Sequence, residues 1–178
     1  MPAKKKNEQF KYEAGGIERF AESYHPSLEN CVKRLDDMLK QEGYTKQNAF
    51  KNETALNLDE AETALSTRKK NKSMTVDWVI FLNKGHLLLS EAKFHIKNAR
   101  NVDEGFFHEI ERKVSSSKSI ILKEDNFLNL HIEKTTVVLF QEEIVEQCVN
   151  RFRRFAAGKP EPELKPSNVE DFYQNYFT

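Results

Sequence analysis

The chain has 178 residues, of which 28 are Lys or Arg and 28 are Asp or Glu, so its formal net charge is zero. With 38% hydrophobic residues, 13 Phe, 5 Tyr and one Trp, it is too apolar and too aromatic for a disordered chain, and we expect one compact domain. The balance of charge excludes a polycation that grips nucleic acid by net charge alone. Contact with nucleic acid would need a local basic face or a metal site.

Cysteine usage and apolar runs predict the compartment. Cys31 and Cys148 are too few for a disulfide framework, and neither has a metal-ligand spacing. No apolar stretch follows the N-terminal MPAKKKNEQ, so it is not typical of a signal peptide, and the longest apolar runs are far shorter than a membrane span. We therefore expect a soluble cytoplasmic protein with no membrane partner.

Composition divides the chain into three segments. Residues 1–14 are polar, Lys-rich and aperiodic, which is typical of a flexible arm. Residues 15–157 carry the periodic apolar patterns and are expected to form the single domain. Residues 158–178 are rich in proline and then in aromatic residues, and we expect a tail that either docks on the domain or contacts a partner. Its aromatic residues are Phe172, Tyr173, Tyr176 and Phe177.

Helical stripes precede residue 44. Apolar residues recur at three and four from Ile17 to Tyr24 and again from Ser27 to Gln41, with Pro26 between them and Gly43 after them. This spacing predicts two consecutive helices, or one helix bent at Pro26.

The remaining elements follow in a mixed order. Residues 44–73 show weak strand signals at 44–50 and a short helix at 59–66. Downstream we expect a hairpin at 74–94, an amphipathic helix at 106–121, an apolar strand at 135–140 and a helix at 142–155. This order predicts an α/β fold with a central mixed β-sheet, which contains the hairpin and is flanked by helices on both faces.

The hairpin carries the strongest signal. Two β-rich runs flank the sequence Asn-Lys-Gly at 83–85. A loop of two residues would place Asp77 opposite Ala92, and would separate Asp77 from Glu91. A loop of three residues would place Asp77 opposite Glu91.

We expect the three-residue loop, because that hairpin type needs glycine in the left-handed conformation, where Gly85 falls. Leu82 then pairs with His86. Side chains alternate along a strand, so the acids at 77 and 91 share one face with Lys93, while Trp78 faces the other side as a core residue.

Two facing carboxylates in this hairpin require compensation. Both faces of the hairpin are mostly apolar, so Asp77 and Glu91 are expected in a covered part of the sheet. At a separation of about 5 Å and an effective dielectric near 20, they repel by roughly 3 kcal/mol. Lys93 supplies only one positive charge. A divalent cation would remove the conflict, and sites with two carboxylates suit Mg²⁺ or Mn²⁺.

This pattern resembles the PD-(D/E)XK nuclease superfamily, which has the restriction endonuclease-like fold. Asp77 is followed, after a spacer of thirteen residues, by Glu91-Ala92-Lys93 on the second strand of the hairpin. Val76 stands where the motif has proline, and the following helix lacks the Gln-x-x-x-Tyr pattern of one exonuclease branch. The resemblance covers residues 27–140. It implies a metal-dependent nuclease that hydrolyses phosphodiester bonds, acting on DNA rather than RNA and as an endonuclease.

The resemblance also implies roles for individual residues. Asp77 and Glu91 would hold the metal, with the backbone carbonyl of Ala92 as a further ligand. Lys93 would orient or activate the attacking water and stabilise charge on the phosphate. The superfamily often adds an acid from the first core helix. Glu29 is the first candidate for it, with Glu22 and Glu18 as rivals.

Basic residues near the motif are candidates for nucleic-acid binding, although each also fits an ordinary solvated surface. They are Arg68, Lys69, Lys70 and Lys72 before the first hairpin strand, and Lys113 and Lys118 on the helix after it. The alternative function is a catalytically inactive module of the same fold that binds nucleic acid or a protein partner, and a homodimer is also compatible. The histidines share no spacing on one element, so we expect no histidine metal site.

Overall fold

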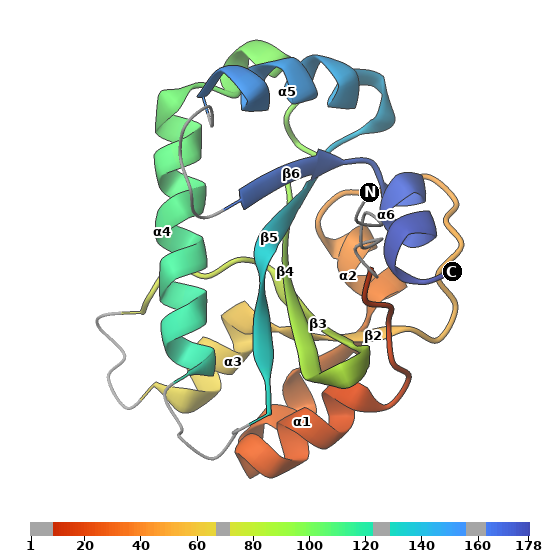
Figure 1. The fold of residues 1–178 in the computed structure, drawn as a ribbon, viewed down its shortest axis with the longest axis vertical. Coiled ribbons are helices and arrows are strands. Elements are labelled where there is room, and N and C mark those ends of the chain that lie inside the picture. Colours follow the sequence, from red (N-terminus) through yellow and green to blue (C-terminus); the bar gives the residue numbers. More distant parts are fainter. Residues whose placement is uncertain (1–8, 67–71, 123–128, 156–162) are drawn as a thin grey trace, which may run out of the picture.

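The computed structural model describes residues 9–66, 72–122, 129–155 and 163–178, which form an α/β fold around one open six-stranded sheet (Figure 1). The strands lie side by side in chain order. They are β1 (Val32–Arg34), β2 (Thr54–Asn57), β3 (Trp78–Leu82), β4 (His86–Ala92), β5 (His131–Leu139) and β6 (Glu163–Ser167).

The sheet is mixed, as predicted. Strands β1 to β4 are successively antiparallel, whereas β4, β5 and β6 run parallel to one another. Parallel neighbours need a crossover connection, and two helices provide it: α4 between β4 and β5, and α5 between β5 and β6. The described helices are α1 (Gly16–Tyr24), α2 (Leu35–Gln41), α3 (Leu58–Leu65), α4 (Glu104–Ile121), α5 (Glu142–Phe155) and α6 (Val169–Tyr176), with 3-10 turns at Pro26–Cys31, Asn83–Gly85 and Ala99–Asn101.

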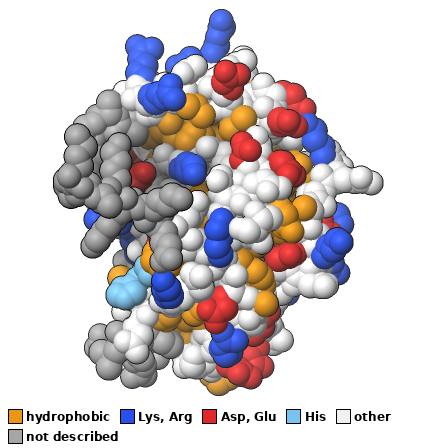
Figure 2. Space-filling view, turned by 45° about the vertical axis from the view of Figure 1, so that its right-hand side comes forward, with side chains coloured by type: hydrophobic (Ala, Val, Ile, Leu, Met, Phe, Trp, Pro, Cys, Tyr) orange, Lys and Arg blue, Asp and Glu red, His pale blue; other side chains and the backbone are white. Residues whose placement is uncertain are grey.

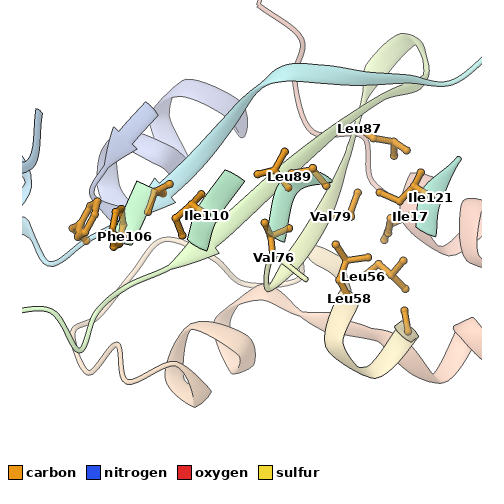
Figure 3. Packing of buried hydrophobic residues seen from close by; sticks show 14 of the residues in the cluster. Ile17, Leu56, Leu58, Val76, Val79, Leu87, Leu89, Phe106, Ile110 and Ile121 are labelled. Carbon is orange, nitrogen blue, oxygen red and sulfur yellow. The ribbon is translucent and has the colours of Figure 1, made fainter. Parts of the chain in front are cut away.

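Helices cover both faces of the sheet. The larger apolar cluster joins one face to α1, α3, α4 and α5. Figure 3 shows part of it, in which Val79 and Leu89 of the hairpin lie near Ile17 of α1 and Ile110 of α4. A second cluster joins the opposite face to α2 and α6. A sheet buried on both sides explains why the strands read as nearly continuous apolar runs.

The hairpin has the predicted register. Leu82 pairs with His86 and Val79 with Leu89, and the loop is Asn83–Gly85 with Gly85 at φ 75°. Trp78 belongs to the cluster on the opposite face, as predicted.

The helix predicted from Ser27 to Gln41 was wrong in its middle. The chain forms a 3-10 turn at Pro26–Cys31, then β1, and only then α2 from Leu35. Lys33 pairs with Ala55 of β2, so sheet formation outweighs the helical spacing of the apolar residues. The strand signals at 44–50 were also wrong, since the strand lies later, at Thr54–Asn57. The helix expected at 59–66 corresponds to α3.

The C-terminal segment is part of the domain rather than a separate tail. Strand β6 pairs with β5, and Phe172 and Tyr176 of α6 are buried in the cluster that α6 shares with α2. Of the arm expected at 1–14, the described residues 9–14 also pack on the domain. Tyr12 bridges to Leu82, and its amide donates to the carbonyl of Tyr176 at 2.7 Å.

Two further expectations can be compared with the described residues. Cys31 and Cys148 are buried and free, so neither forms a disulfide. In the described part of the chain, no helix has the length and apolar character needed to cross a membrane.

Candidate active site

The predicted triad gathers where β3 begins and β4 ends. Asp77 immediately precedes β3, Glu91 lies near the end of β4, and Lys93 follows β4 directly. The amide of Ala92 donates to Asp77 Oδ2 at 2.6 Å, and the amide of Leu58 donates to the Asp77 carbonyl at 3.0 Å. The side chain of Asp77 is therefore fixed by β4 and its backbone by the first residue of α3.

Glu91 is the most deeply buried member of the group, with 1% of its surface exposed. Its Oε1 accepts from Lys113 Nζ at 2.6 Å and lies 2.9 Å from Lys93 Nζ. Its Oε2 is also buried, and no described residue donates to it. A buried carboxylate oxygen without a donor is costly, so Oε2 is an acceptor whose partner the described residues do not supply.

Lys93 is held as an ammonium group. Its Nζ lies 3.1 Å from Glu109 Oε1 in addition to its contact with Glu91, and 5.9 Å from the centre of the Phe106 ring. Burial alone would lower the pKa of Lys93, but the carboxylates of Glu91 and Glu109 outweigh burial and raise it. Lys93 therefore suits charge stabilisation and orientation of water better than proton abstraction.

Asp77 is the group whose protonation the site perturbs most. Burial, and secondly the charge of Glu91, raise the pKa of Asp77 to about 7, although the Ala92 amide opposes this shift. A bound cation would relieve the repulsion between the carboxylates of Asp77 and Glu91.

A cavity of about 380 Å³ opens beside Asp77. Its walls come from the end of α2, the start of α3, the entry to β3 and one residue of α4. Its lining residues are Met38, Gln41, Glu42, Asn57, Asp59, Glu60, Thr75, Asp77, Trp78 and Lys113. Of the triad, Asp77 lines the cavity, and Lys113, which contacts Glu91, lines it as well.

One acid next to the preceding helices lines the cavity and acts electrostatically on Asp77: Glu42, directly after α2. Its side chain is exposed and lines the cavity. Partial desolvation by nearby protein atoms, and secondly the charge of Glu91, raise the pKa of Glu42. The choice of Glu29 was wrong: it is exposed on the turn at Pro26–Cys31 and does not line the cavity. Of its rivals, Glu22 is exposed on α1, and Glu18 accepts from Thr54 at 2.6 Å.

The carboxylate oxygens of the site suit a hard divalent cation such as Mg²⁺ or Mn²⁺ better than zinc. Within the described residues, no group of three or more His, Cys, Asp and Glu side chains is arranged to hold a metal. Zinc needs such a group, whereas Mg²⁺ is held by one or two carboxylates together with water and substrate phosphate. Asp77 and the unpaired Oε2 of Glu91 meet that lower requirement.

The residues predicted to bind nucleic acid lie in different places in the structure. Lys113 lines the cavity and contacts Glu91, so it belongs to the site itself. Lys72 forms an ion pair of 2.8 Å with Asp59, another cavity residue. Lys118 lies further along α4 and forms no ion pair within the described residues. Arg68, Lys69 and Lys70 lie outside the described residues.

The hairpin places His86 at its turn, away from the triad. His86, at the other end of the hairpin, contacts Glu133 and stacks on the Phe10 ring with centroids 3.5 Å apart. On the described part of the face in Figure 2, basic and acidic side chains are interspersed and no continuous basic stripe is visible. Net charge on this face therefore does not mark a nucleic-acid surface.

The chain matches no protein-family model, no curated protein and no solved structure. The chemistry of the site is consequently the basis for assigning a function.

Proposed function

We propose that the protein is a metal-dependent nuclease of the PD-(D/E)XK type, which hydrolyses phosphodiester bonds and acts on DNA as an endonuclease. The observation that carries the proposal is the convergence of Asp77, Glu91 and Lys93 at one end of the sheet, beside a cavity that Asp77 lines. The order of elements around this group, hairpin, α4 and then parallel β5, supports it because this is the order that the resemblance implies.

Asp77 and Glu91 would hold Mg²⁺ or Mn²⁺, with the Ala92 carbonyl as a further ligand implied by the resemblance. A divalent cation in such a site neutralises phosphate oxygens and lowers the pKa of water. A metal-binding role for Asp77 explains why an acid with a raised pKa is retained next to another carboxylate.

The chain's own residues supply the remaining chemistry. The protonated Lys93 donates to the attacking water or to a phosphate oxygen, where negative charge accumulates as the bond breaks. Glu109 fixes the Lys93 ammonium from α4. Glu91 fixes it from the strand side, so its direction is set before substrate binds.

The proposal is tested by incubating the protein with circular duplex, linear duplex and single-stranded DNA, and with RNA, in Mg²⁺, Mn²⁺ or EDTA. We expect cleavage of the circular duplex in either metal and none in EDTA. Asp77→Asn and Lys93→Met should each reduce the rate by about 10²–10³, because each removes a group that stabilises the transition state. Lys40→Met, an exposed lysine paired with Asp36, should cleave like wild type.

Absence of metal-dependent cleavage on every substrate, or equal rates for wild type and both site variants, would refute the nuclease proposal. Such a result would favour the second candidate, a catalytically inactive binding module. One observation supports that candidate: Lys93 and Lys113 both contact Glu91, so the chain can neutralise this carboxylate without a metal. The module predicts nucleic-acid binding that persists in EDTA and in Glu91→Gln.

A further inference from the structure

Glu91 Oε1 is contacted by two lysines whose surroundings differ. Lys113 Nζ lies 2.6 Å from this oxygen and Lys93 Nζ lies 2.9 Å from it. One carboxylate oxygen therefore accepts from two ammonium groups, while the other oxygen of the same carboxylate has no donor among the described residues. This uneven distribution of donors over the two carboxylate oxygens suggests that one of the two ammonium groups contacts Glu91 only temporarily.

The Lys93 ammonium is held in place by contacts other than the one with Glu91. The Lys93 side chain is 9% exposed, and Glu109 contacts it at 3.1 Å in addition to Glu91. Its ammonium also lies 5.9 Å from the centre of the Phe106 ring. These contacts retain Lys93 even if Glu91 takes another partner.

Lys113 has a single close partner and an open path. Its Nζ lies 3.9 Å from Glu109, too far for a strong hydrogen bond, so Glu91 is its main contact. Its side chain also lines the cavity beside Asp77. A lysine side chain has a flexible four-carbon stem, and it can therefore turn from Glu91 toward the cavity without any backbone movement.

A divalent cation and Lys113 compete for Glu91. A cation on Glu91 places two positive charges next to the Lys113 ammonium, and in a buried site like charges repel strongly. Lys93 would feel the same repulsion but retains the charge of Glu109. The ammonium that can move into the cavity is therefore Lys113.

We propose that Lys113 is a second, movable lysine of the site, which neutralises Glu91 while no cation is bound and is released by the cation to contact a phosphate oxygen of the nucleic-acid strand in the cavity. The proposal rests on the nuclease function above and adds a metal-controlled phosphate contact to it. It explains how a buried carboxylate remains neutralised before the metal binds. It also implies that the contact between Lys113 and phosphate forms only after the metal has bound.

The decisive measurement is the ammonium signal of each lysine by NMR, using ¹⁵N-lysine-labelled protein with and without Mg²⁺. Lys113→Arg and Lys93→Arg assign the two signals, and the Ala92 amide signal reports whether Mg²⁺ has bound. We expect Mg²⁺ to remove the Lys113 signal, because an ammonium released into water exchanges its protons rapidly, and to leave the Lys93 signal in place. If Ala92 responds to Mg²⁺ while the Lys113 signal persists, Lys113 is a fixed structural partner and this inference fails without affecting the nuclease proposal. If Mg²⁺ changes none of the three signals, both proposals fail.

Salt dependence gives a second readout that does not need turnover. Binding of a short DNA duplex to wild type and Lys113→Met is measured in EDTA and in Ca²⁺, with the DNA checked afterwards for breaks. In EDTA the two proteins should show equal slopes of log K against log salt. In Ca²⁺ the wild-type slope should be steeper by about 0.9, the value of one additional phosphate contact on duplex DNA. A slope difference that is already present in EDTA, or absent in both conditions, would overturn the release of Lys113. Lys40→Met should follow wild type throughout.

Discussion

Single residues of the site are arranged so that each buried charge has a partner from a different element. Glu91 from β4 is contacted by Lys93 after β4 and by Lys113 from α4, and Glu109 contacts Lys93. Removing one partner of a buried ion pair costs about 3–5 kcal/mol, whereas an apolar core of the same volume is often more stable. Stability alone therefore does not account for such a network.

The sequence could predict some of these residues but not all of them. Strand alternation and the loop length were sufficient to place Asp77, Glu91 and Lys93 together. Glu42 follows the last turn of α2, which packs on the same face of the sheet as α6. No periodic pattern in the sequence therefore connects Glu42 to the triad. Glu109 and Lys113 had a readable signal, since acid and base four residues apart on a helix face form a pair.

The raised pKa of Asp77 predicts an unusual dependence of stability on pH. Its pKa rises from an ordinary 3.8 to about 7 in the folded protein, so the folded state binds the proton more tightly than the unfolded state. The stabilisation is complete below pH 3.8 and is lost as the pH rises through about 7. In EDTA, we expect the melting temperature to fall by several degrees between pH 5 and pH 8, since one pKa unit corresponds to about 1.4 kcal/mol.

Asp77→Asn should remove most of this fall, because the amide does not titrate. Asp36→Asn is the matched control: Lys40 lowers the pKa of Asp36, so that group is already ionised across this range. Thermal melts of the three proteins at matched ionic strength provide the test. Identical pH profiles for wild type and Asp77→Asn would show that the Asp77 carboxyl is not perturbed.

At the scale of elements, the hairpin and the helices with long apolar stripes followed the local pattern, and the first strand did not. Helix α5 begins and ends where the spacing predicted, because a complete amphipathic face is buried on the sheet. Strand β1 has only three residues, and each of them pairs with a residue of β2 that lies twenty or more positions later in the chain. A pattern within one segment cannot show such a pairing, so the short strand was interpreted as helix.

The turn of the hairpin depends on Gly85 for two separate reasons. Its φ is 75°, and a Cβ at this position would lie 2.5 Å from the carbonyl oxygen of Asn129. Gly85→Ala therefore adds a steric clash with the backbone to the cost of the left-handed conformation. Gly43 is a matched control, because its φ is 92° but a Cβ there would have no atom within 4 Å.

We expect Gly43→Ala to lower the free energy of unfolding by about 1–2 kcal/mol, the cost of the left-handed conformation alone. Gly85→Ala should lower it by about 1–3 kcal/mol more, because the hairpin end or residue 129 must move. Urea unfolding of the two variants measures the difference. Equal losses would indicate that the segment at Asn129 moves away without cost.

At the scale of the whole molecule, the two ends of the described chain are joined. The segment at residues 9–13 lies against the hairpin and α6, since Lys11 Nζ donates to the Asn175 carbonyl at 2.7 Å and the Glu13 amide donates to the Phe81 carbonyl at 3.1 Å. Composition alone suggested an arm and a tail, because polar and Pro-rich segments are usually loops. Their contacts with the domain come from a few aromatic side chains and an edge strand, and composition does not show these.

The C-terminal helix should accordingly be essential to the stability of the whole domain. Phe172 is 0% exposed, and its ring centroid lies 5.5 Å from that of Phe177 and 6.2 Å from that of Phe50. Phe172→Ala would leave a cavity between α6 and the sheet, and we expect it to lower the free energy of unfolding by about 3–5 kcal/mol. Gln174→Ala, an exposed position on the same helix, should change it by less than about 0.5 kcal/mol. Both are measured by urea unfolding followed by Trp78 fluorescence and by circular dichroism. Coincident transitions are expected, because α6 and Trp78 share one apolar cluster. If Phe172→Ala unfolded like wild type, residues 163–178 would be an appendage of the domain and not part of its core.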